Sequence, residues 1–194
     1  MATPAKQIDT SKITLTAPAA VGKSGMKIHK VSYANKPLNI LLTDELTCPF
    51  QPSAYRGNGI EERLGIVMKA PDDLYQVFAG IEARCRGLLH LDNFEKLEEL
   101  WCPTARSNEF GQTLRANINV CGDNACDFWN AEDERTGPPD DIRIVSFQAM
   151  CLVRGVYTMK TSFGFIIDVT TMKYEEKSAA QVEHFFSIAP RATR

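Results

Sequence analysis

The sequence predicts a small β-rich α+β domain, in which antiparallel strands form a closed or partly closed barrel with one or two helices and long loops. Three observations support this fold class. Residues 142–153, 154–160 and 163–174 are rich in Val, Ile, Phe, Thr and Met, which favour strands. Residues 113–121 alternate apolar and polar side chains, as a strand with one buried face does. Residues 72–89 have the apolar spacing of an amphipathic helix.

The predicted strands are separated by recognisable turns. Thr161 and Ser162 lie between the last two strands and predict a hairpin. Gly155 and Gly164 interrupt strand interiors, where glycine marks a bulge or a close approach of another backbone. Further strands are expected at 27–33, 38–43 and 63–69.

Two helices are expected, both as cover for the core. The apolar residues of the 72–89 segment fall on one stripe that includes Cys85, and Asp72 is expected to cap its first turn. A shorter helix is predicted at 93–101. Between the strands, residues 47–52 predict a rigid turn because they contain two prolines, and residues 53–59 predict an irregular loop.

One domain accounts for most of the chain. Its 194 residues, 44% hydrophobic and 24% charged, are ordinary for a single globular domain. We expect a flexible basic tail over residues 1–25, the barrel domain over 26–176 and an extension over 177–194. The first residues lack a continuous apolar run, and no stretch is long enough to span a bilayer, so we expect an intracellular protein of the nucleus or cytoplasm.

The net charge of −2 conceals a segregation along the chain. Residues 1–36 contain six lysines against Asp9 alone, which gives +5. Residues 123–141 sum to −6, and residues 142–174 sum to +3. A strongly basic protein of the histone kind is excluded, but a locally basic nucleic-acid binder is not. The acidic segment is interpreted as a solvated loop, anchored by Phe128 and Trp129.

No enzyme, cofactor or metal site is expected. The phosphate-loop, nucleophile-elbow and zinc-protease motifs are absent, and three scattered histidines give no local nucleophile pair. Cys85 and Cys151 lie in apolar patterns and are expected in the core. Cys121 and Cys126 form a C-x4-C pair, but no second pair with zinc-ligand spacing stands near it.

Cationic and aromatic residues are interleaved on the predicted strands. Single-stranded nucleic acid needs both, because cations follow the phosphates while rings stack on bases. The cationic candidates are Lys30, Arg56, Arg115, Arg143, Arg154 and Lys160. The aromatic candidates are Tyr55, Tyr157 and Phe163. A core position is the alternative interpretation of each ring.

Several short motifs resemble those of the single-stranded-DNA-binding proteins of large eukaryotic DNA viruses. They lie at residues 37–40, 47–50, 113–118, 152–157 and 162–165. The match is loose and spans 37–174, and Gln112 departs from it, because the family pattern has an aromatic residue and proline before this strand. The resemblance implies an OB-like β-barrel. It also implies nucleic-acid contacts for Arg115, Arg154, Tyr157, Lys160 and Phe163.

The sequence therefore favours a non-enzymatic, sequence-independent binder of single-stranded DNA that acts in replication, repair or recombination. RNA is an open alternative ligand, a replication protein is a candidate partner for the acidic segment, and a homo-oligomer is compatible with the sequence. The second hypothesis is a virion or coat protein whose basic N-terminal arm neutralises packaged nucleic acid. The third is an enzyme with a pocket between helix 72–89 and the sheet.

Overall fold

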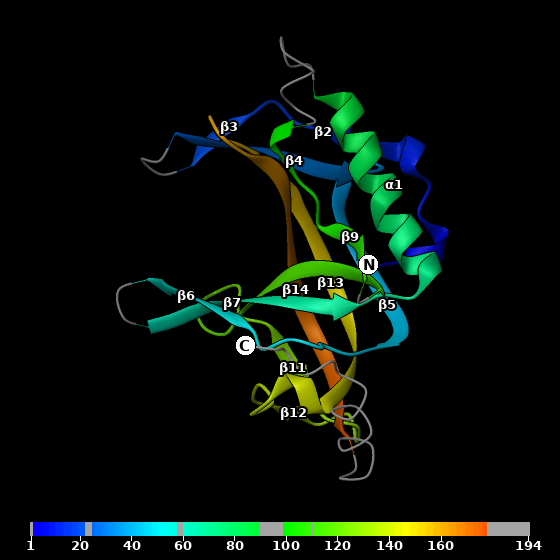
Figure 1. The fold of residues 1–194 in the computed structure, drawn as a ribbon, viewed down its shortest axis with the longest axis vertical. Helices are drawn as coiled ribbons and strands as arrows, with labels where there is room; N and C mark the ends of the chain where they lie inside the picture. The colour runs from blue at the N-terminus through cyan, green and yellow to red at the C-terminus, as the bar shows by residue number, and fades with distance from the viewer. Residues whose placement is uncertain (1, 22–24, 58–59, 90–98, 110, 178–194) are drawn as a thin grey trace.

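The computed structural model describes residues 2–21, 25–57, 60–89, 99–109 and 111–177 (Figure 1). The strands, in chain order, are β1 (Thr3–Pro4), β2 (Ile13–Leu15), β3 (Ala19–Val21), β4 (Met26–Tyr33), β5 (Lys36–Leu46), β6 (Ser53–Gly57), β7 (Ile60–Lys69), β8 (Trp101–Cys102), β9 (Ala105–Asn108), β10 (Gly111–Asn119), β11 (Asp127–Trp129), β12 (Arg135–Thr136), β13 (Val145–Thr158) and β14 (Phe163–Glu176). The helices are η1 (Ala5–Gln7), η2 (Thr10–Lys12), α1 (Asp72–Leu88) and η3 (Ile142–Ile144).

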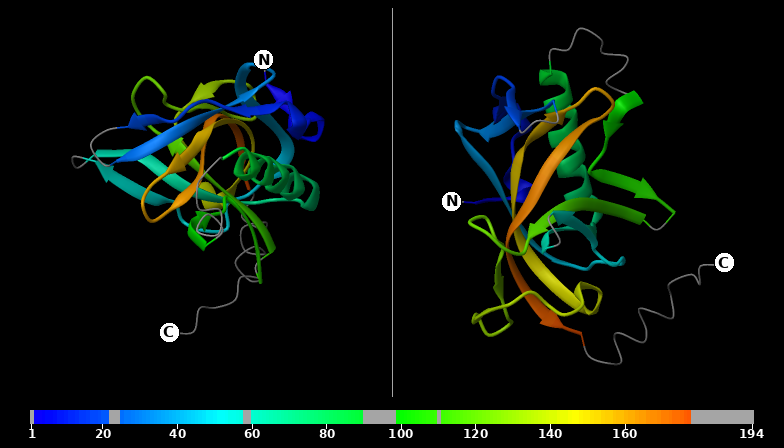
Figure 2. Two further views of the ribbon diagram at one scale, coloured as in Figure 1. Left: turned by 90° about the horizontal axis from the view of Figure 1, so that it is seen from above. Right: turned by 90° about the vertical axis from the view of Figure 1, so that its left-hand side faces the viewer.

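The long antiparallel pair β13–β14 is the centre of the fold and runs the length of the molecule (Figure 2). The predicted strands 142–153 and 154–160 are one continuous strand, and the predicted hairpin is present, with Met159 N donating to Ser162 O at 2.9 Å. The register shifts between Val153 and Gly155, where a Cβ on Gly155 would lie 2.4 Å from the carbonyl oxygen of His29. Gly155 therefore marks both a bulge and a close backbone approach, as the sequence predicts.

The other strands join this pair on both sides. The hydrogen-bonded order is β1-β5-β4-β13-β14-β10-β7-β6, and among the described strands it does not close on itself. Most pairings are antiparallel, but β10, β11 and β8 run parallel to β14. The predicted fold class, a β-rich OB-like fold, is confirmed, with a sheet that stays open.

The inward faces of the strands and one face of α1 form the core. In β10, Leu114, Ala116 and Ile118 are buried, as the alternation predicts. Cys85 and Cys151 are also buried, as predicted. Helix α1 begins at Asp72, but Asp72 does not cap it. The N-cap position is Pro71, and no side chain caps the helix there.

Several expected irregular segments are ordered. The residues predicted as a flexible tail form short strands and 3-10 turns, of which η1, η2 and β2 pack beside α1, and Ile13 is fully buried. Their strands have two or three residues, too few to show a period in the sequence.

Residues 53–57, predicted as loop, form strand β6 against β7. Most of the predicted helix 93–101 lies outside the described residues, and its last residue, Trp101, begins β8. Residues 178–194 also lie outside them.

The acidic segment is tied down at the end of β14 away from the hairpin turn. Phe128 is buried, and β11 pairs with residues 171–173 of β14. Asp127 pairs with Arg135, and Asp133 accepts from Lys173 at 2.6 Å. The segment is therefore partly neutralised and lies at the lower end of the molecule in Figure 1. Within the described ranges, no helix is long and apolar enough to cross a membrane.

Candidate nucleic-acid interface

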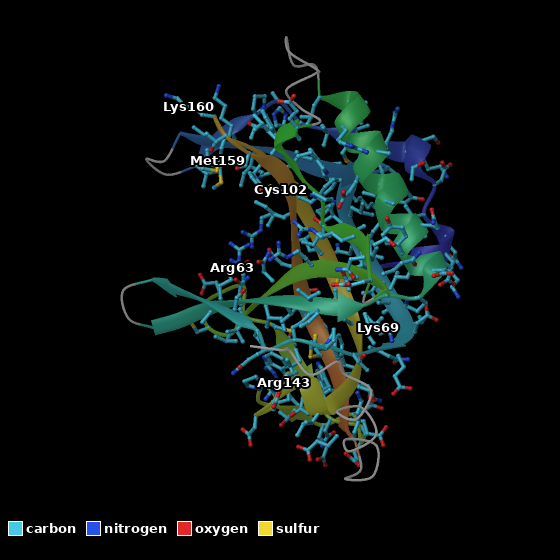
Figure 3. The ribbon with its side chains drawn as sticks, in the orientation of Figure 1. Arg63, Lys69, Cys102, Arg143, Met159 and Lys160 are labelled. Carbon is cyan, nitrogen blue, oxygen red and sulfur yellow. The ribbon has the colours of Figure 1, made fainter. Side chains whose placement is uncertain are left out.

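A groove of about 520 Å³ opens between the β6–β7 hairpin and the tip of the β13–β14 hairpin. Figure 3 places Arg63 on the side of β7 and Met159 at the hairpin tip, with Cys102 on the wall formed by β8 and β9. Ile166 and Ile167 of β14 also line it, together with Phe165. The groove thus joins residues of eight strands, from β4 to β14, that lie far apart in the sequence.

Three arginines line this groove: Arg63 of β7, Arg106 of β9 and Arg115 of β10. No aspartate or glutamate is among the described residues that line it. Because three like charges are concentrated and no carboxylate is among the described lining residues, the groove favours an anionic ligand such as a phosphate chain. We call this feature the arginine groove, after these three residues.

Strand pairing puts two of the arginines on one face. Arg115 is opposite Val67, and Arg63 is opposite Asn119, in the antiparallel pair of β7 and β10. Residues opposite each other point to the same side, so both arginines face the groove and lie about 13 Å apart along the strands. The alternate residues, such as Met68, point into the core.

Other contacts fix the floor of the arginine groove. Asn117 Nδ2 donates to Ile167 O at 3.0 Å, which joins β10 to β14. Arg115 N donates to Thr104 O at 3.0 Å, which joins β10 to the wall beside β9. These hydrogen bonds fix the strands relative to one another, so the arginine side chains extend from a rigid backbone.

Tyr157 is the aromatic residue that lines the arginine groove near the hairpin. It is half-buried, and its ring lies over Gly164 of β14. A Cβ on Gly164 would lie 2.9 Å from Tyr157 Cε1 and 2.9 Å from Cys102 O. Glycine is required here because the ring and the β8 backbone both approach its Cα.

The structure brings some of the sequence-predicted site residues together. Arg115 and Tyr157 line the arginine groove, and Lys160 lies at the hairpin tip next to Met159 (Figure 3). Phe163 begins β14 and packs against the core while pairing with Trp101. Lys30 lies on β4, opposite Gly155. Tyr55 and Arg56 belong to β6, and their side chains lie outside what the structure describes.

Two predicted contact residues instead form ion pairs away from the arginine groove. Arg154 pairs with Asp168, whose side chain is only 3% exposed. Arg143 binds both carboxylate oxygens of Asp141, at 2.6 to 3.0 Å, and these bonds lower the pKa of Asp141. Neither arginine is among the lining residues. Both guanidinium groups therefore have partners within the fold, and their contact with nucleic acid stays a prediction.

Sequence reasoning missed Arg63 and Arg106. Arg63 could have been found, because residues 63–69 alternate as 113–119 do and place Arg63, Gly65 and Val67 on one face. Arg106 stands in a strand of four residues, which is too short for a period to show. Its role depends on where β9 lies beside β10.

The described part of the chain contains no cluster of side chains that could hold a metal ion. No three His, Cys, Asp or Glu residues gather there. Burial raises the pKa of the Cys126 thiol to about 12, so the thiolate that a metal requires is disfavoured.

The fold of this protein resembles that of known proteins. The chain is similar to the crystal structure of gp2.5, a single-stranded DNA-binding protein encoded by bacteriophage T7. The TM-score is 0.53 at 10% identity, over 81% of this chain and 98% of that one. The likeness extends over nearly the whole T7 protein, and at this identity it is one of fold.

Two structures of the single-stranded DNA-binding protein from bacteriophage Enc34 are also similar. The protein alone matches with a TM-score of 0.48 and 13% identity, over 85% of this chain and 91% of that one. Its complex with single-stranded DNA matches with a TM-score of 0.48 and 13% identity, over 83% and 95%. No protein-family model and no curated protein sequence matches the chain.

Proposed function

We propose that this protein binds single-stranded DNA without sequence preference, along the arginine groove. The observation that supports this function most directly is a groove with three arginines and no carboxylate among its described lining residues. Arg63, Arg106 and Arg115 would contact phosphates, and Lys160 would extend the cationic path past the hairpin tip. Phosphate contacts of this type are independent of base sequence.

The bases would face the apolar part of the same groove. Tyr157 offers a ring for stacking, and Phe165, Ile166 and Ile167, each about nine-tenths or more buried, form an apolar floor beside it. Paired bases are stacked within a duplex and cannot reach such a surface, so the arrangement favours a single strand. The similarity of the fold to the single-stranded DNA-binding protein of bacteriophage T7 supports the same proposal.

The setting that we propose is replication, repair or recombination inside a cell, in the nucleus or the cytoplasm, and without catalysis by this chain. The resemblance to proteins of large eukaryotic DNA viruses supports a viral replication site. The acidic segment lies at the far end of β14, so a replication protein could bind there while DNA occupies the arginine groove.

A coat or assembly role is less well supported. It depends on a free basic arm, but Lys6 bonds to Asp73 at 2.7 Å, and Lys12 pairs with Asp9 at 3.6 Å. Lys6 thereby holds the N-terminal segment near α1, and Lys12 is paired within that segment.

Fluorescence anisotropy with a labelled single-stranded oligonucleotide tests the proposed function. We expect binding at ~50 mM salt that weakens as salt rises, because bound phosphates release counterions. Unlabelled single-stranded DNA should compete well and duplex DNA poorly, and an RNA competitor of the same sequence compares the two nucleic acids. Absence of binding at low salt, or equal competition by duplex, would overturn the proposal.

A further inference from the structure

Glu82 is a buried carboxylate that the proposed binding mode does not use. It lies on α1 with 5% of its surface exposed. Its Oε1 accepts from the backbone N–H groups of Thr104, at 2.7 Å, and Ala105, at 3.0 Å. Its Oε2 accepts from the indole Nε1 of Trp101 at 3.3 Å. Burial raises the pKa of Glu82, while these donors oppose that shift.

The segment held by Glu82 is one wall of the arginine groove. Cys102, Pro103, Thr104 and Arg106 all line the groove. Arg106 follows directly after the two anchored peptide groups, and its Nε donates to Pro103 O at 3.1 Å. The position of the Arg106 guanidinium is therefore set by the wall that Glu82 fixes to α1.

Besides Glu82, this wall is held by short ladders: β9 pairs with β10 over four residues, and Thr104 O accepts from Arg115 N at 3.0 Å. Strand β8 has two residues and β9 has four, so their ladders provide few hydrogen bonds. The Trp101 ring adds an edge-to-face contact with Phe165, at 5.8 Å between centroids, and lies under Arg86 at 5.6 Å. By contrast, Arg115 stands in a nine-residue strand with seven paired positions to β7, so its place does not depend on Glu82.

A carboxylate suits this position because three N–H groups donate to it and the Thr104 side chain also favours its charged form. Charge-assisted bonds of this kind are stronger than neutral ones. An amide would turn one of the two oxygens into a donor and leave an N–H facing an N–H, which costs free energy in a buried site.

We propose that Glu82 is a positioning residue for the arginine groove: it fixes the Trp101–Arg106 wall so that Arg106 reaches a bound phosphate. The inference rests on the proposed function. It predicts that Glu82 affects DNA binding through Arg106. A residue that only stabilised the fold would not act through Arg106.

Salt-dependent oligonucleotide binding of four proteins tests this: wild type, Glu82→Gln, Arg106→Gln and the double variant. We expect Glu82→Gln to weaken binding three- to tenfold and to lower the salt slope by about 0.7, the loss of one single-strand phosphate contact. In the Arg106→Gln background, Glu82→Gln should change neither quantity further. Ile81→Val is the control, because Ile81 is a buried apolar neighbour on α1 and makes none of these polar bonds.

Other outcomes overturn the proposal in distinguishable ways. Additive effects of the two substitutions, or an unchanged salt slope in Glu82→Gln, would reduce Glu82 to a structural residue. Absence of binding by the wild type would overturn the proposed function and this inference with it.

A second variant serves if Glu82→Gln does not fold. Trp101→Phe removes the bond to Oε2 and keeps a ring, although a smaller one, beside Phe165 and Arg86. A smaller loss of binding is expected, again absent in the Arg106→Gln background. Amide hydrogen exchange of Thr104 and Ala105 in this variant should be faster than in the wild type. Unchanged exchange together with unchanged binding would contradict the anchor.

Discussion

The arginines of this protein differ in whether their charge is used within the fold. Arg154 and Arg143 bind Asp168 and Asp141, whereas Arg106 and Arg115 are exposed beside the groove. Both groups look alike in the sequence, where each arginine stands beside apolar strand residues. The partners of Arg154 and Arg143 therefore decide which arginines are candidates for phosphate contacts.

Arg154→Ala should destabilise the fold more than it weakens DNA binding. Removing this guanidinium would leave the Asp168 carboxylate buried without its ion-pair partner. We expect a loss of about 2–3 kcal/mol in the free energy of unfolding, toward the low end for a buried pair because Arg154 is 39% exposed. Urea denaturation measures this loss. A stable variant with a reduced salt slope of binding would instead show that Arg154 contacts phosphate.

Tyr157→Ala should separate stacking from charge. If a base stacks on this ring, the affinity for a single strand should fall by about 1–3 kcal/mol while the salt slope stays constant. Tyr157→Phe keeps the ring and is expected to bind nearly as the wild type does. Anisotropy titrations at several salt concentrations measure both quantities, and full affinity in the alanine variant would exclude Tyr157 as a stacking platform.

Glu82 should make stability depend on pH in a defined direction. Its pKa is raised in the folded protein above the ordinary value of 4.5, so the folded state binds the proton more tightly than the unfolded state. This contribution to stability is fully present below about pH 4.5 and is lost as pH rises through the folded pKa.

Urea denaturation of the wild type and Glu82→Gln across this pH range measures that contribution. The other carboxylates are common to both proteins, so their effects largely cancel in the difference. The free energy of unfolding of the wild type, minus that of the variant, should fall as pH rises. A difference that rises with pH would contradict the raised pKa.

At the scale of elements, the β13–β14 pair shows which structural features a sequence pattern can predict. The residue types over 142–174 predict the strands, and the glycines predict a bulge and close approaches correctly. The pattern cannot give the register, which shifts twice along the pair. It therefore could not show that Arg154 lies beside Asp168, on the partner strand across the hairpin.

Short elements account for most of what the sequence did not predict. The alternation in residues 113–121 predicted the face that presents Arg115, because nine residues are enough to show a period of two. Strands β1, β2, β8 and β9 have two to four residues each, and their pairing depends on contacts far away in the chain. The N-terminal segment and the Arg106 wall were missed for this reason.

Gly155→Ala should destabilise the central pair. A methyl group there would lie 2.4 Å from the His29 carbonyl oxygen and 2.8 Å from a methyl carbon of Ile28, so β4 would have to move away from β13. Overpacking of this kind costs about 1–3 kcal/mol. Gly87→Ala is a matched control, because nothing lies within 4 Å of a Cβ at that helical position. Thermal denaturation compares the two, and equal stability would contradict the close approach.

At the scale of the molecule, the near-zero net charge is divided between two ends of the β13–β14 pair. The arginine groove lies toward the hairpin turn, and the acidic segment lies beside residues 171–173 of β14. The acidic segment, which nearly cancels the basic residues in the sequence, therefore lies apart from the arginines of the groove. The central claim is that these arginines form the nucleic-acid interface.

The salt dependence of single-strand binding in a double variant tests that claim most directly. Arg106→Gln with Arg115→Gln should lower the salt slope by about 1.4 and weaken binding strongly at low salt, because each arginine would contact one phosphate. The control is Arg135→Gln with Lys173→Gln, which makes the same change in net charge at the acidic end. We predict a control slope close to the wild-type value. Equal slopes in the two double variants would contradict the account.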